Sequence, residues 1–589
     1  MMELYKNNHI EEMPLQSPFF RKKVDGFLQA NGLRMETLDV YYTLQNTEGD
    51  ILAGAGLAGD VLKCVAVAPE AREEGLVAPL VSHILSQHGP GNVKVFTKPE
   101  YESVFASLGF HLIARAPLAI LMENGRGLET YCAYLRSLAG DARASSAHTT
   151  GVVVMNANPF TLGHQYLLEQ AAAQVDRLVV IPVKEDVSAF TYEERLAMIR
   201  AGAATVSASP VIVADGSDYQ ISAATFPTYF LKDLSDAART QMQLDLDLFA
   251  RHIAPALGAT VRFVGSEPLD ALTAGYNALM QERLPVRVVE IPRLCHSAQR
   301  EESVISASLV RQALEQGSYS RAAALCPEST RPYLLAFLAD RALRKELDTP
   351  LKPGLVCPDS KGAHKDMDYA LMQKGIAALR PYWSRMAKAT VPPLLQMIGI
   401  EAEKAMKKAT GGVNTHRGAI FALGLALNAR GVEVSVSEEV MQNNLARIAQ
   451  AILCNSVTDT DSHSTHGGQA VKQYGVKGAR EMALEGYKDL WADWLPYYRS
   501  LSGMETASCQ LQRTLLRIMS TLDDTCVIHR AGYARAQQVK REAADLLSCP
   551  EPCGRLQTLC DQYAAEGISP GGAADMLALT LLTNSLINL

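Results

Sequence analysis

GVVVMNANPFTLGHQYLLEQA, residues 151–171, passes from an apolar run through a polar turn into a helical pattern. Gly151 to Met155 form a continuous apolar segment with three valines, which is typical of a parallel strand covered on both faces. Two asparagines and Pro159 break this segment, and residues 162–173 are predicted to be a helix. The stretch therefore predicts a buried strand, a turn and a helix in direct succession.

The turn carries a pattern that suits phosphate binding. Thr161-x-Gly163-His164 stands at the expected helix N-terminus, where unpaired N–H groups and the helix dipole favour an anion. Gly163 allows a phosphate to approach the backbone, and His164 can donate to a phosphoryl oxygen. The pattern matches the (His/Thr)-x-Gly-His motif of nucleotidyltransferases, with Asn158 beside it as a further binding candidate. The alternative is a strand–helix unit that binds no ligand.

A second motif of the same kind lies about one domain length downstream. ISASLVR begins at Ile305, and Ser306 or Ser308 is a plausible N-cap for the helix that follows. Arg311 falls three residues after Ser308, on the same helix face. In nucleotidyltransferases such a segment binds the triphosphate, and two motifs in the proper order favour this function over the ligand-free alternative.

Composition limits the class of protein. The chain has 589 residues, 48% of them hydrophobic and 20% charged, as in ordinary globular proteins with several domains. The net charge of −7 argues against broad binding to nucleic acid or anionic membranes. The sequence shows no signal-peptide pattern and no apolar run that would span a bilayer. Eleven scattered cysteines predict a reducing cytoplasm, and a zinc site at Cys549, Cys553 and Cys560 is a weaker alternative.

The pattern of elements changes twice along the chain. Residues 1–145 mix short strands and helices, and residues 148–336 alternate apolar strands with helices. This alternation predicts a doubly wound parallel sheet with ligands at the carboxyl ends of its strands. Residues 337–589 contain Ala/Leu-rich helical stretches separated by polar loops, and are predicted to be all-α. The change of architecture indicates a fusion of two proteins.

The first 336 residues resemble citrate lyase ligase. The resemblance rests on MNANPFTLGHQYLLEQA, IPVKEDVSAFTYEERLAMI, RFVGSEP and ISASLVR. It implies that acetate attacks the α-phosphate of ATP, and that the acetyl group of the resulting acetyl-adenylate passes to the thiol of the prosthetic arm on the lyase carrier subunit. Thr161 and His164 would hold the α-phosphate, and Ser306, Ser308 and Arg311 the pyrophosphate. Lys184 and Arg195 are further cationic candidates or surface charges, and Gly265 and Glu267 would line the adenosine pocket.

The N-terminal part resembles GNAT-type acetyltransferases. VAVAPEAREEGLVAPLV from Val65 has the strand-to-helix order that presents backbone N–H groups to a CoA pyrophosphate. Arg72 and Gly75 match the phosphate loop of that family, but Val77 stands where a small residue is preferred. The resemblance implies a GNAT-like domain that docks the CoA-like arm, or a purely structural module.

The second half resembles triphosphoribosyl-dephospho-CoA synthase. The segments that carry the resemblance are GAHKDMDYALM, TGGVNTHRGAIFALGLAL, DSHSTHGGQAVKQYGVKGAREMALEGY, LDDTCVIHRAG and ISPGGAADMLA. The implied reaction joins the 2′-hydroxyl of dephospho-CoA to the ribose C1′ of ATP and releases adenine. Cys357 departs from the family, which usually has Asp after KPGLV.

Polyphosphate substrates call for cations and Mg²⁺, and the polar loops of this half contain suitable residues. Asp366 and Asp368 share a face in an extended segment and are the predicted Mg²⁺ ligands, and Asp523 and Asp524 form a second acidic pair. The predicted phosphate-binding cations are Lys352, Lys365, Arg417, Lys477 and Arg480; the candidates for the base are His416, His463 and His466, with His466 favoured, and His364 and Asn414 complete the polar set. A zinc site from His364, His416 and His466, or a set of helix caps without a ligand, are the alternatives.

These observations predict a bifunctional, ATP-using maturation enzyme for citrate lyase, with acetate, dephospho-CoA and the acyl-carrier subunit as partners and Mg²⁺ as cofactor. The predicted fold is a GNAT-like α/β domain and a Rossmann-like α/β domain followed by an all-α domain. The alternatives are a synthase for another acyl-carrier system, such as malonate decarboxylase, and a non-catalytic carrier-binding scaffold.

Overall fold

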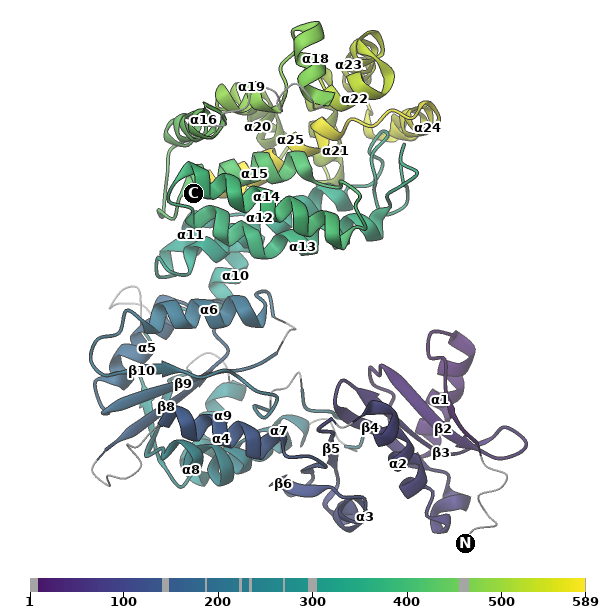
Figure 1. Ribbon diagram of the computed structural model, residues 1–589, viewed down its shortest axis with the longest axis vertical. Coiled ribbons are helices and arrows are strands. Elements are labelled where there is room, and N and C mark those ends of the chain that lie inside the picture. Colours follow the sequence, from purple (N-terminus) through teal and green to yellow (C-terminus); the bar gives the residue numbers. More distant parts are fainter. Residues whose placement is uncertain are drawn as a thin grey trace. The chain divides into compact units, whose positions relative to one another are not determined.

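The computed structural model describes residues 9–89, 91–139, 148–185, 188–221, 225–231, 236–267, 271–294, 305–454 and 466–587 (Figure 1). The chain forms two compact units. The first contains Met1–Asn158 and Gly163–Val304, and the second contains Pro159–Leu162 and Ile305–Leu589. The first is mixed α/β and the second is helical, which confirms the predicted change of architecture.

The first unit begins with a seven-stranded sheet in the order β1-β2-β3-β4-β5-β7-β6. Only β4 and β5 pair in parallel, and the other neighbours are antiparallel. The strands are β1 (His9–Glu12), β2 (Val40–Gln45), β3 (Ile51–Ala58), β4 (Val61–Val67), β5 (Lys94–Thr97), β6 (His111–Arg115) and β7 (Ile120–Glu123). The helices of this part are α1 (Pro18–Ala30), η2 (Pro69–Glu74), α2 (Val77–His88), η3 (Pro99–Tyr101), α3 (Glu102–Ser107) and α4 (Gly127–Ala139).

The second sheet of this unit has five strands, all parallel, in the order β10-β9-β8-β11-β12. The segment quoted first forms β8 (Thr150–Met155) and α5 (Leu162–Ala172), as predicted. The other elements are β9 (Arg177–Pro182), α6 (Tyr192–Ala203), β10 (Val211–Val213), α7 (Ala237–Leu248), η6 (Phe249–Ile253), α8 (Ala254–Leu257), β11 (Val261–Gly265), α9 (Ala271–Arg283) and β12 (Arg287–Ile291). The strand order reverses at β8, where a crevice for ligands opens in such sheets.

The two sheets of the first unit share one hydrophobic core. Buried residues from Met13 in the first part to Leu257 in the second belong to a single cluster. The segment after β10 packs against the first sheet: the Tyr229 hydroxyl donates to the Phe96 carbonyl of β5, and its surroundings include Cys64 of β4. The side chains of Tyr219, Asn92 and Glu123 also form a hydrogen-bonded group. The first sheet is therefore an integral part of the α/β unit.

The helical unit is built around its last helix. The helices are α10 (Ala307–Glu315), α11 (Tyr319–Ala324), α12 (Arg331–Asp348), α13 (Tyr369–Lys388), α14 (Pro392–Ala409), α15 (Arg417–Arg430), α16 (Glu438–Cys454), α18 (His466–Tyr474), α19 (Ala479–Leu484), η8 (Leu490–Trp494), α20 (Leu495–Ser500), α21 (Ala507–Thr521), α22 (Thr525–Ala531), α23 (Tyr533–Leu547), η9 (Cys553–Arg555), α24 (Leu556–Glu566) and α25 (Gly571–Ile587). α25 contacts α12, α15 and α21. Because most side chains from Ala573 to Leu586 are apolar and buried, this helix depends on the helices that cover it.

The boundary between the units lies earlier than the expected boundary at residues 336–337. α10 and α11 belong to the helical unit, although the sequence pattern assigned them to the α/β part. The Arg430 guanidinium at the end of α15 stacks on the Tyr319 ring, 4.4 Å from its centroid. Arg341 of α12 donates to the Leu314 carbonyl of α10 at 2.7 Å. Residues 305–330 thus pack onto α12, which follows them directly, and onto α15, which is far away in sequence; local patterns do not reveal the second contact.

One of the three cysteines considered for a zinc site forms a disulfide instead. Cys509, at the start of α21, forms a disulfide with Cys553 of η9. Cys549 and Cys560 have free thiols, so the three cysteines considered for zinc do not act together. Among the residues that the structure describes, no helix is both long enough and apolar enough to cross a membrane.

Candidate active sites

In the α/β unit, polar residues follow the carboxyl ends of four parallel strands. Asn156 and Asn158 follow β8, Lys184 follows β9, Glu267 follows β11 and Arg293 follows β12. Because the carboxyl ends of parallel strands meet at one edge, these residues gather at the crevice predicted from the strand order. Ala157 between the two asparagines has a φ of 48°, which is unusual for a residue with a side chain. The turn after β8 is therefore held in a conformation that its own sequence does not favour.

His164 lies in the first turn of α5. Burial, and then the charge of Arg293, lower the pKa of His164 to about 4. The imidazole is therefore neutral at physiological pH, and it can donate one hydrogen bond without carrying a charge.

Arg293 is a cation of this site that the sequence analysis missed. Its guanidinium forms an ion pair with Glu267 and donates to the Ser266 carbonyl at 2.7 Å. The family resemblance predicts that Glu267 and Gly265 line the adenosine pocket. Gly265 ends β11 and has open space where a side chain would begin. The only sequence signal for Arg293 was its place just after a predicted strand.

Arg195 has a different role from the predicted phosphate contact. It is fully buried in α6, and it donates to the carbonyls of Asn156 and Val183, both at 2.9 Å. Glu185 and Phe190 supply further carbonyl acceptors. The guanidinium therefore links the loop after β8 to the loop after β9 through hydrogen bonds to their backbone carbonyls. The other predicted cation, Lys184, is about half exposed and lies 3.3 Å from the Asp218 carboxylate.

The remaining predicted phosphate residues occupy the helical unit or the turn before α5. Ser306 caps α10 by accepting the Leu309 N–H at 3.3 Å, which confirms one of the two predicted N-caps. Arg311 donates to the Ser308 hydroxyl at 3.1 Å, as their shared helix face predicts. Thr161 is buried directly before α5.

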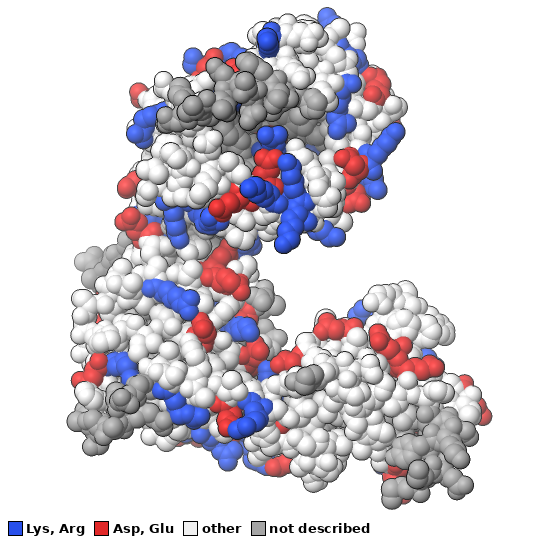
Figure 2. All heavy atoms as spheres, viewed as in Figure 1, with Lys and Arg blue, Asp and Glu red and all other residues white. Residues whose placement is uncertain are grey.

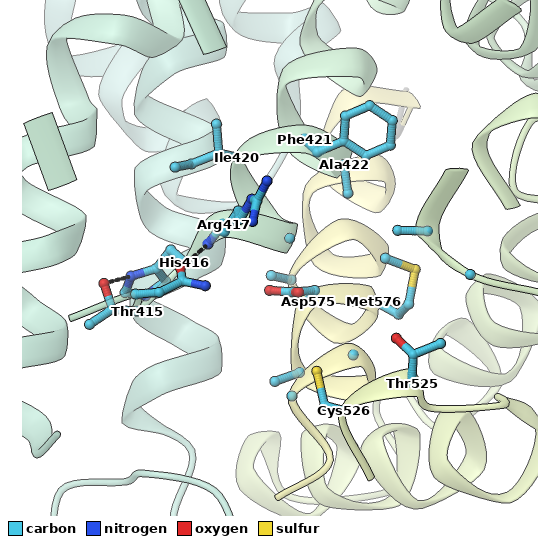
Figure 3. A pocket seen from close by; sticks show the side chains of 18 of the residues that line it. Thr415, His416, Arg417, Ile420, Phe421, Ala422, Thr525, Cys526, Asp575 and Met576 are labelled. Carbon is cyan, nitrogen blue, oxygen red and sulfur yellow. Dashed lines mark hydrogen bonds between the residues drawn. The ribbon is translucent and has the colours of Figure 1, made fainter. Parts of the chain in front are cut away.

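A cavity of about 1010 Å³ opens in the helical unit (Figure 3). Nine of the predicted residues line it: Lys352, His364, Asn414, His416, Arg417, Lys477, Arg480, Asp523 and Asp524. Apolar side chains such as Leu395, Ile400 and Phe421 line it as well. The cavity thus combines charged and apolar walls, as a site for a long ligand with both kinds of groups would.

Three of the cavity residues interact mainly with other groups of the protein and are less available to a ligand. The Lys352 ammonium is buried and forms an ion pair with Glu346. Asp524 caps α22 by accepting the N–H groups of Cys526 and Val527, and its other oxygen accepts the Ala573 N–H at 2.9 Å. Burial, and then Lys352, lower the pKa of His416 to about 3, and its Nε2 is enclosed without a partner. A histidine held neutral in this way is a poor general base, which weakens that assignment.

Basic residues at the cavity wall are more exposed. Arg417 lies 3.4 Å from Glu403, and Lys477 lies 2.7 Å from Glu485. Figure 2 shows Lys and Arg side chains gathered over α13 and α14, interleaved with acidic ones. Arg417 and Lys477 are therefore exposed enough to contact a polyphosphate.

The predicted Mg²⁺ pair does not line the cavity in the part of the chain that the structure describes. Asp368 is the N-cap of α13 and accepts the Leu371 N–H at 2.9 Å. This backbone hydrogen bond lowers the pKa of Asp368. Asp366 is exposed, with its carboxylate 3.9 Å from Nδ1 of His364, and Lys365 is exposed as well. The helix-cap alternative thus describes Asp368, whereas Asp366 stands beside a cavity residue.

Two predicted histidines are not placed by the structure. His463 lies outside the described residues, and His466 begins α18 without a described side chain. The described residues contain no group of three or more His, Cys, Asp and Glu that could hold a metal ion.

Comparisons with known proteins divide the chain in the same two parts. Residues 150–334 match the citrate lyase ligase C-terminal domain, and residues 332–589 match the ATP:dephospho-CoA triphosphoribosyl transferase family. The [Citrate [pro-3S]-lyase] ligase of Escherichia coli is 39% identical over 52% of this chain and 88% of its own length. That of Klebsiella pneumoniae is 38% identical over 54% of this chain and 92% of its own length. The 2-(5''-triphosphoribosyl)-3'-dephosphocoenzyme-A synthase of Escherichia fergusonii is 33% identical over 42% of this chain and 88% of its own length.

The chain belongs to both families. We call residues 150–334 the ligase region and residues 332–589 the synthase region. The two regions meet inside the first turn of α12, with no linker between them. The last part of the ligase region, including Ser306 and Arg311, is therefore built into the same compact unit as the synthase region.

The synthase region contains a carboxylate that the sequence analysis quoted but did not single out. Asp575 lies in the ISPGGAADMLA segment, on the first turns of α25, and lines the cavity. Figure 3 shows it projecting from α25 toward His416 and Arg417 at the start of α15. Its signal was that it is the one charged residue of a largely apolar helix.

Cys357, the departure from the synthase family, is buried in a short antiparallel bridge with Ser360. It is not among the residues that line the cavity, whereas Leu355 and Val356 are. Cys357 is therefore not part of the described cavity wall.

Proposed function

We propose that this chain is a bifunctional maturation enzyme of citrate lyase. The ligase region would activate acetate with ATP and transfer the acetyl group to the thiol of the prosthetic arm on the acyl-carrier subunit. The synthase region would make 2′-(5″-triphosphoribosyl)-3′-dephospho-CoA from ATP and dephospho-CoA, with release of adenine. The observation that carries the proposal is that one chain covers 88% of a citrate lyase ligase and 88% of a triphosphoribosyl-dephospho-CoA synthase.

For the ligase reaction, the chemistry is an in-line attack of a carboxylate on the α-phosphate. Such a step needs positioning and charge stabilisation more than proton transfer. His164, as a neutral donor at the start of α5, and Arg293 would stabilise the charge on the α-phosphate, and Thr161 would assist. Ser306, Ser308 and Arg311 would hold the leaving pyrophosphate, while Arg195 positions the loops.

For the synthase reaction, Arg417, Lys477, Arg480 and Arg530 line the cavity and would hold the phosphates of both substrates. The apolar wall around Leu395, Ile400 and Phe421 suits the pantetheine arm of dephospho-CoA.

Of the two predicted Mg²⁺ ligands, one is available to a metal ion and the other is used as a helix cap. It usually takes one or two carboxylates, with phosphate oxygens completing its coordination. Asp366 is the exposed carboxylate beside the cavity and would serve as such a ligand, whereas Asp368 would first have to leave its cap. When bound, Mg²⁺ would neutralise phosphate charge.

The finer fold assignments are also proposals. The five parallel strands with a reversal at β8 support a Rossmann-like domain, and the strand–helix order around β4 and α2 supports a GNAT-like one. Tyr229 lies against β4 and β5, and the hydrophobic core is shared. These contacts favour a structural role for the GNAT-like domain over docking of the CoA-like arm. A cytoplasmic location remains the proposal from the cysteine content, and the Cys509–Cys553 disulfide is the observation that counts against it.

Product analysis tests the proposal. Incubation with ATP and dephospho-CoA should release free adenine and a product that carries the triphosphate. Incubation with ATP and acetate should release pyrophosphate and form acetyl-adenylate, which hydroxylamine traps. The malonate decarboxylase alternative predicts adenine release without acetate activation, and the scaffold alternative predicts neither; the match of the ligase region disfavours both.

A further inference from the structure

Asp575 is held in a fixed position at the wall of the synthase cavity. The start of α15 packs directly against it: a Cβ at Gly418 would lie 1.9 Å from Oδ2 of Asp575. The backbone N–H of Ala419 interacts with the same carboxyl group. The side chain is half-buried and so remains open to the cavity. A carboxyl group that is anchored from one side and accessible from the other is well placed to act on a bound substrate.

The surroundings favour the protonated form of this carboxyl group. Burial, followed by the charges of Glu346 and Asp524, raises the pKa of Asp575 well above its ordinary value, and the Ala419 N–H opposes this shift only in part. The buried ammonium of Lys352, which lines the same cavity, is already paired with Glu346. Asp524 differs because its two oxygens accept three backbone N–H groups. Burial raises the pKa of Asp524 as well, but its oxygens are occupied by these N–H groups. Asp575 is therefore the cavity carboxyl group that is placed to give a proton to a ligand.

The reaction proposed for this region needs a proton donor. The bond from C1′ of the ribose to N9 of adenine breaks, and its electron pair leaves with the base. Adenine is a poor leaving group as an anion, and protonation of a ring nitrogen makes it a good one. General acid catalysis of this kind typically contributes about 10²–10⁴-fold in rate.

We propose that Asp575 is the general acid of the synthase reaction, and this inference rests on the proposed function. Its carboxyl proton passes to a ring nitrogen of adenine as the C1′–N9 bond breaks. The 2′-hydroxyl oxygen of dephospho-CoA forms the new bond to C1′, and the Asp575 carboxylate takes up the proton that this hydroxyl releases. One proton circulates, so Asp575 ends the cycle in its starting form.

The test compares two leaving groups. In Asp575→Asn, adenine release from ATP should fall by about 10²–10⁴-fold. With 7-methyl-ATP, whose purine carries a positive charge and leaves without protonation, the same variant should lose less than tenfold. Asn keeps the size of the side chain and an acceptor for the Ala419 N–H. A comparable loss with both substrates, or none with ATP, would overturn the proposal.

The pH profile gives a second reading. The titratable and charged groups around Asp575 are Glu346, Asp524, Cys526 and Tyr487, together with His416 and Arg417 at the start of α15. Lys352 lines the same cavity. The wild-type chain should lose adenine release on the alkaline side as Asp575 ionises, and Asp575→Asn should lack that limb. An unchanged limb in the variant would contradict the assignment.

Controls separate this inference from the proposed function and from folding. Asp545→Asn, at an exposed position of α23, should leave adenine release unchanged. Acetate-dependent pyrophosphate release in the same Asp575→Asn sample should remain, and an unchanged melting temperature shows that the helical unit is folded. If the wild-type chain releases no adenine from ATP and dephospho-CoA, the proposed function fails, and this inference fails with it.

Discussion

At the scale of single residues, burial decides which histidines can act. His164 and His416 both lie at helix starts, and burial lowers the pKa of each, to about 4 and about 3. His164 has the charge of Arg293 beside it, at the edge where the parallel strands end. His416 is bound through Nδ1 to Thr415, at 2.8 Å, and its other nitrogen is enclosed. The first is therefore suited to donate to a ligand, and the second to hold a loop.

Replacement of His164 tests the ligase site. His164→Ala should lower acetate-dependent pyrophosphate release by about 10²–10³-fold, because one donor to the transition-state charge is lost. Adenine release by the synthase region should be unaffected. Near-normal formation of acetyl-adenylate in this variant would remove His164 from the mechanism.

Protonation of the buried histidines should make the chain sensitive to acid. An unfolded histidine has a pKa of about 6.5, whereas that of folded His416 is about 3. Between these values the unfolded state binds a proton that the native state does not, so stability is lost as the pH falls from about 6.5 toward 3. Melting temperatures of His416→Gln should therefore decline less steeply over this range than those of the wild type. His88→Gln, at an exposed position, is the matched control and should keep the wild-type slope.

At the scale of elements, helix starts organise the synthase cavity. Asp368 caps α13, Asp524 caps α22, and Asp575 of α25 packs on the start of α15. Glycines make these approaches possible, since a side chain at Gly418 would overlap the Asp575 carboxylate. The polar loops between the helices thus serve the fold as well as the ligand.

Gly418→Ala should destabilise the helical unit and displace Asp575, because the new methyl group has no space. A lower melting temperature and a loss of adenine release of at least tenfold are expected. Gly399→Ala is the control for stability: it lies within α14 with no atom within 4 Å of the added Cβ. There, alanine should raise stability by about 0.5–1 kcal/mol. Equal melting temperatures for the two variants would contradict this packing.

The two aspartates before α13 should behave differently. Asp368→Asn keeps an efficient N-cap, so stability and adenine release should both stay near wild type, whereas Asp368→Ala should lower the melting temperature. Asp366→Asn should reduce adenine release and raise the Mg²⁺ concentration needed for half-maximal rate. Loss of activity in a stable Asp368→Asn protein would restore Asp368 as a metal ligand.

At the scale of the whole molecule, the end of the ligase region is also the beginning of the helical unit. α10 and α11 pack on α12 and α25, and the Arg430 guanidinium stacks on the Tyr319 ring. A cut near residue 338, which the sequence pattern favours, would divide α12 and expose its buried face.

Truncation tests this boundary. Residues 305–589 should fold and release adenine, whereas residues 338–589 should be far less stable or insoluble, because α12 loses its first half and its neighbours α10 and α11. Circular dichroism melts and adenine release on both fragments give the comparison. Equal stability of the two fragments would show that α10 and α11 are not part of this unit.

The sequence by itself determined the local elements and the families. The strand, turn and helix from Gly151 onward, the cap at Ser306 and the shift from alternating strands to helices all follow from neighbouring residues, so their pattern is readable along the chain. The two families were evident because their motifs are continuous segments.

Only the tertiary structure decided how distant residues meet. It brought Arg293 close to His164, made Arg195 hold two loops together, placed Asp575 against Gly418 and assigned α10 and α11 to the helical unit. The physical reason is the same in each case. Burial, ion pairing and the reach of a side chain depend on elements that are far apart in sequence, and no local pattern records which of them will be in contact.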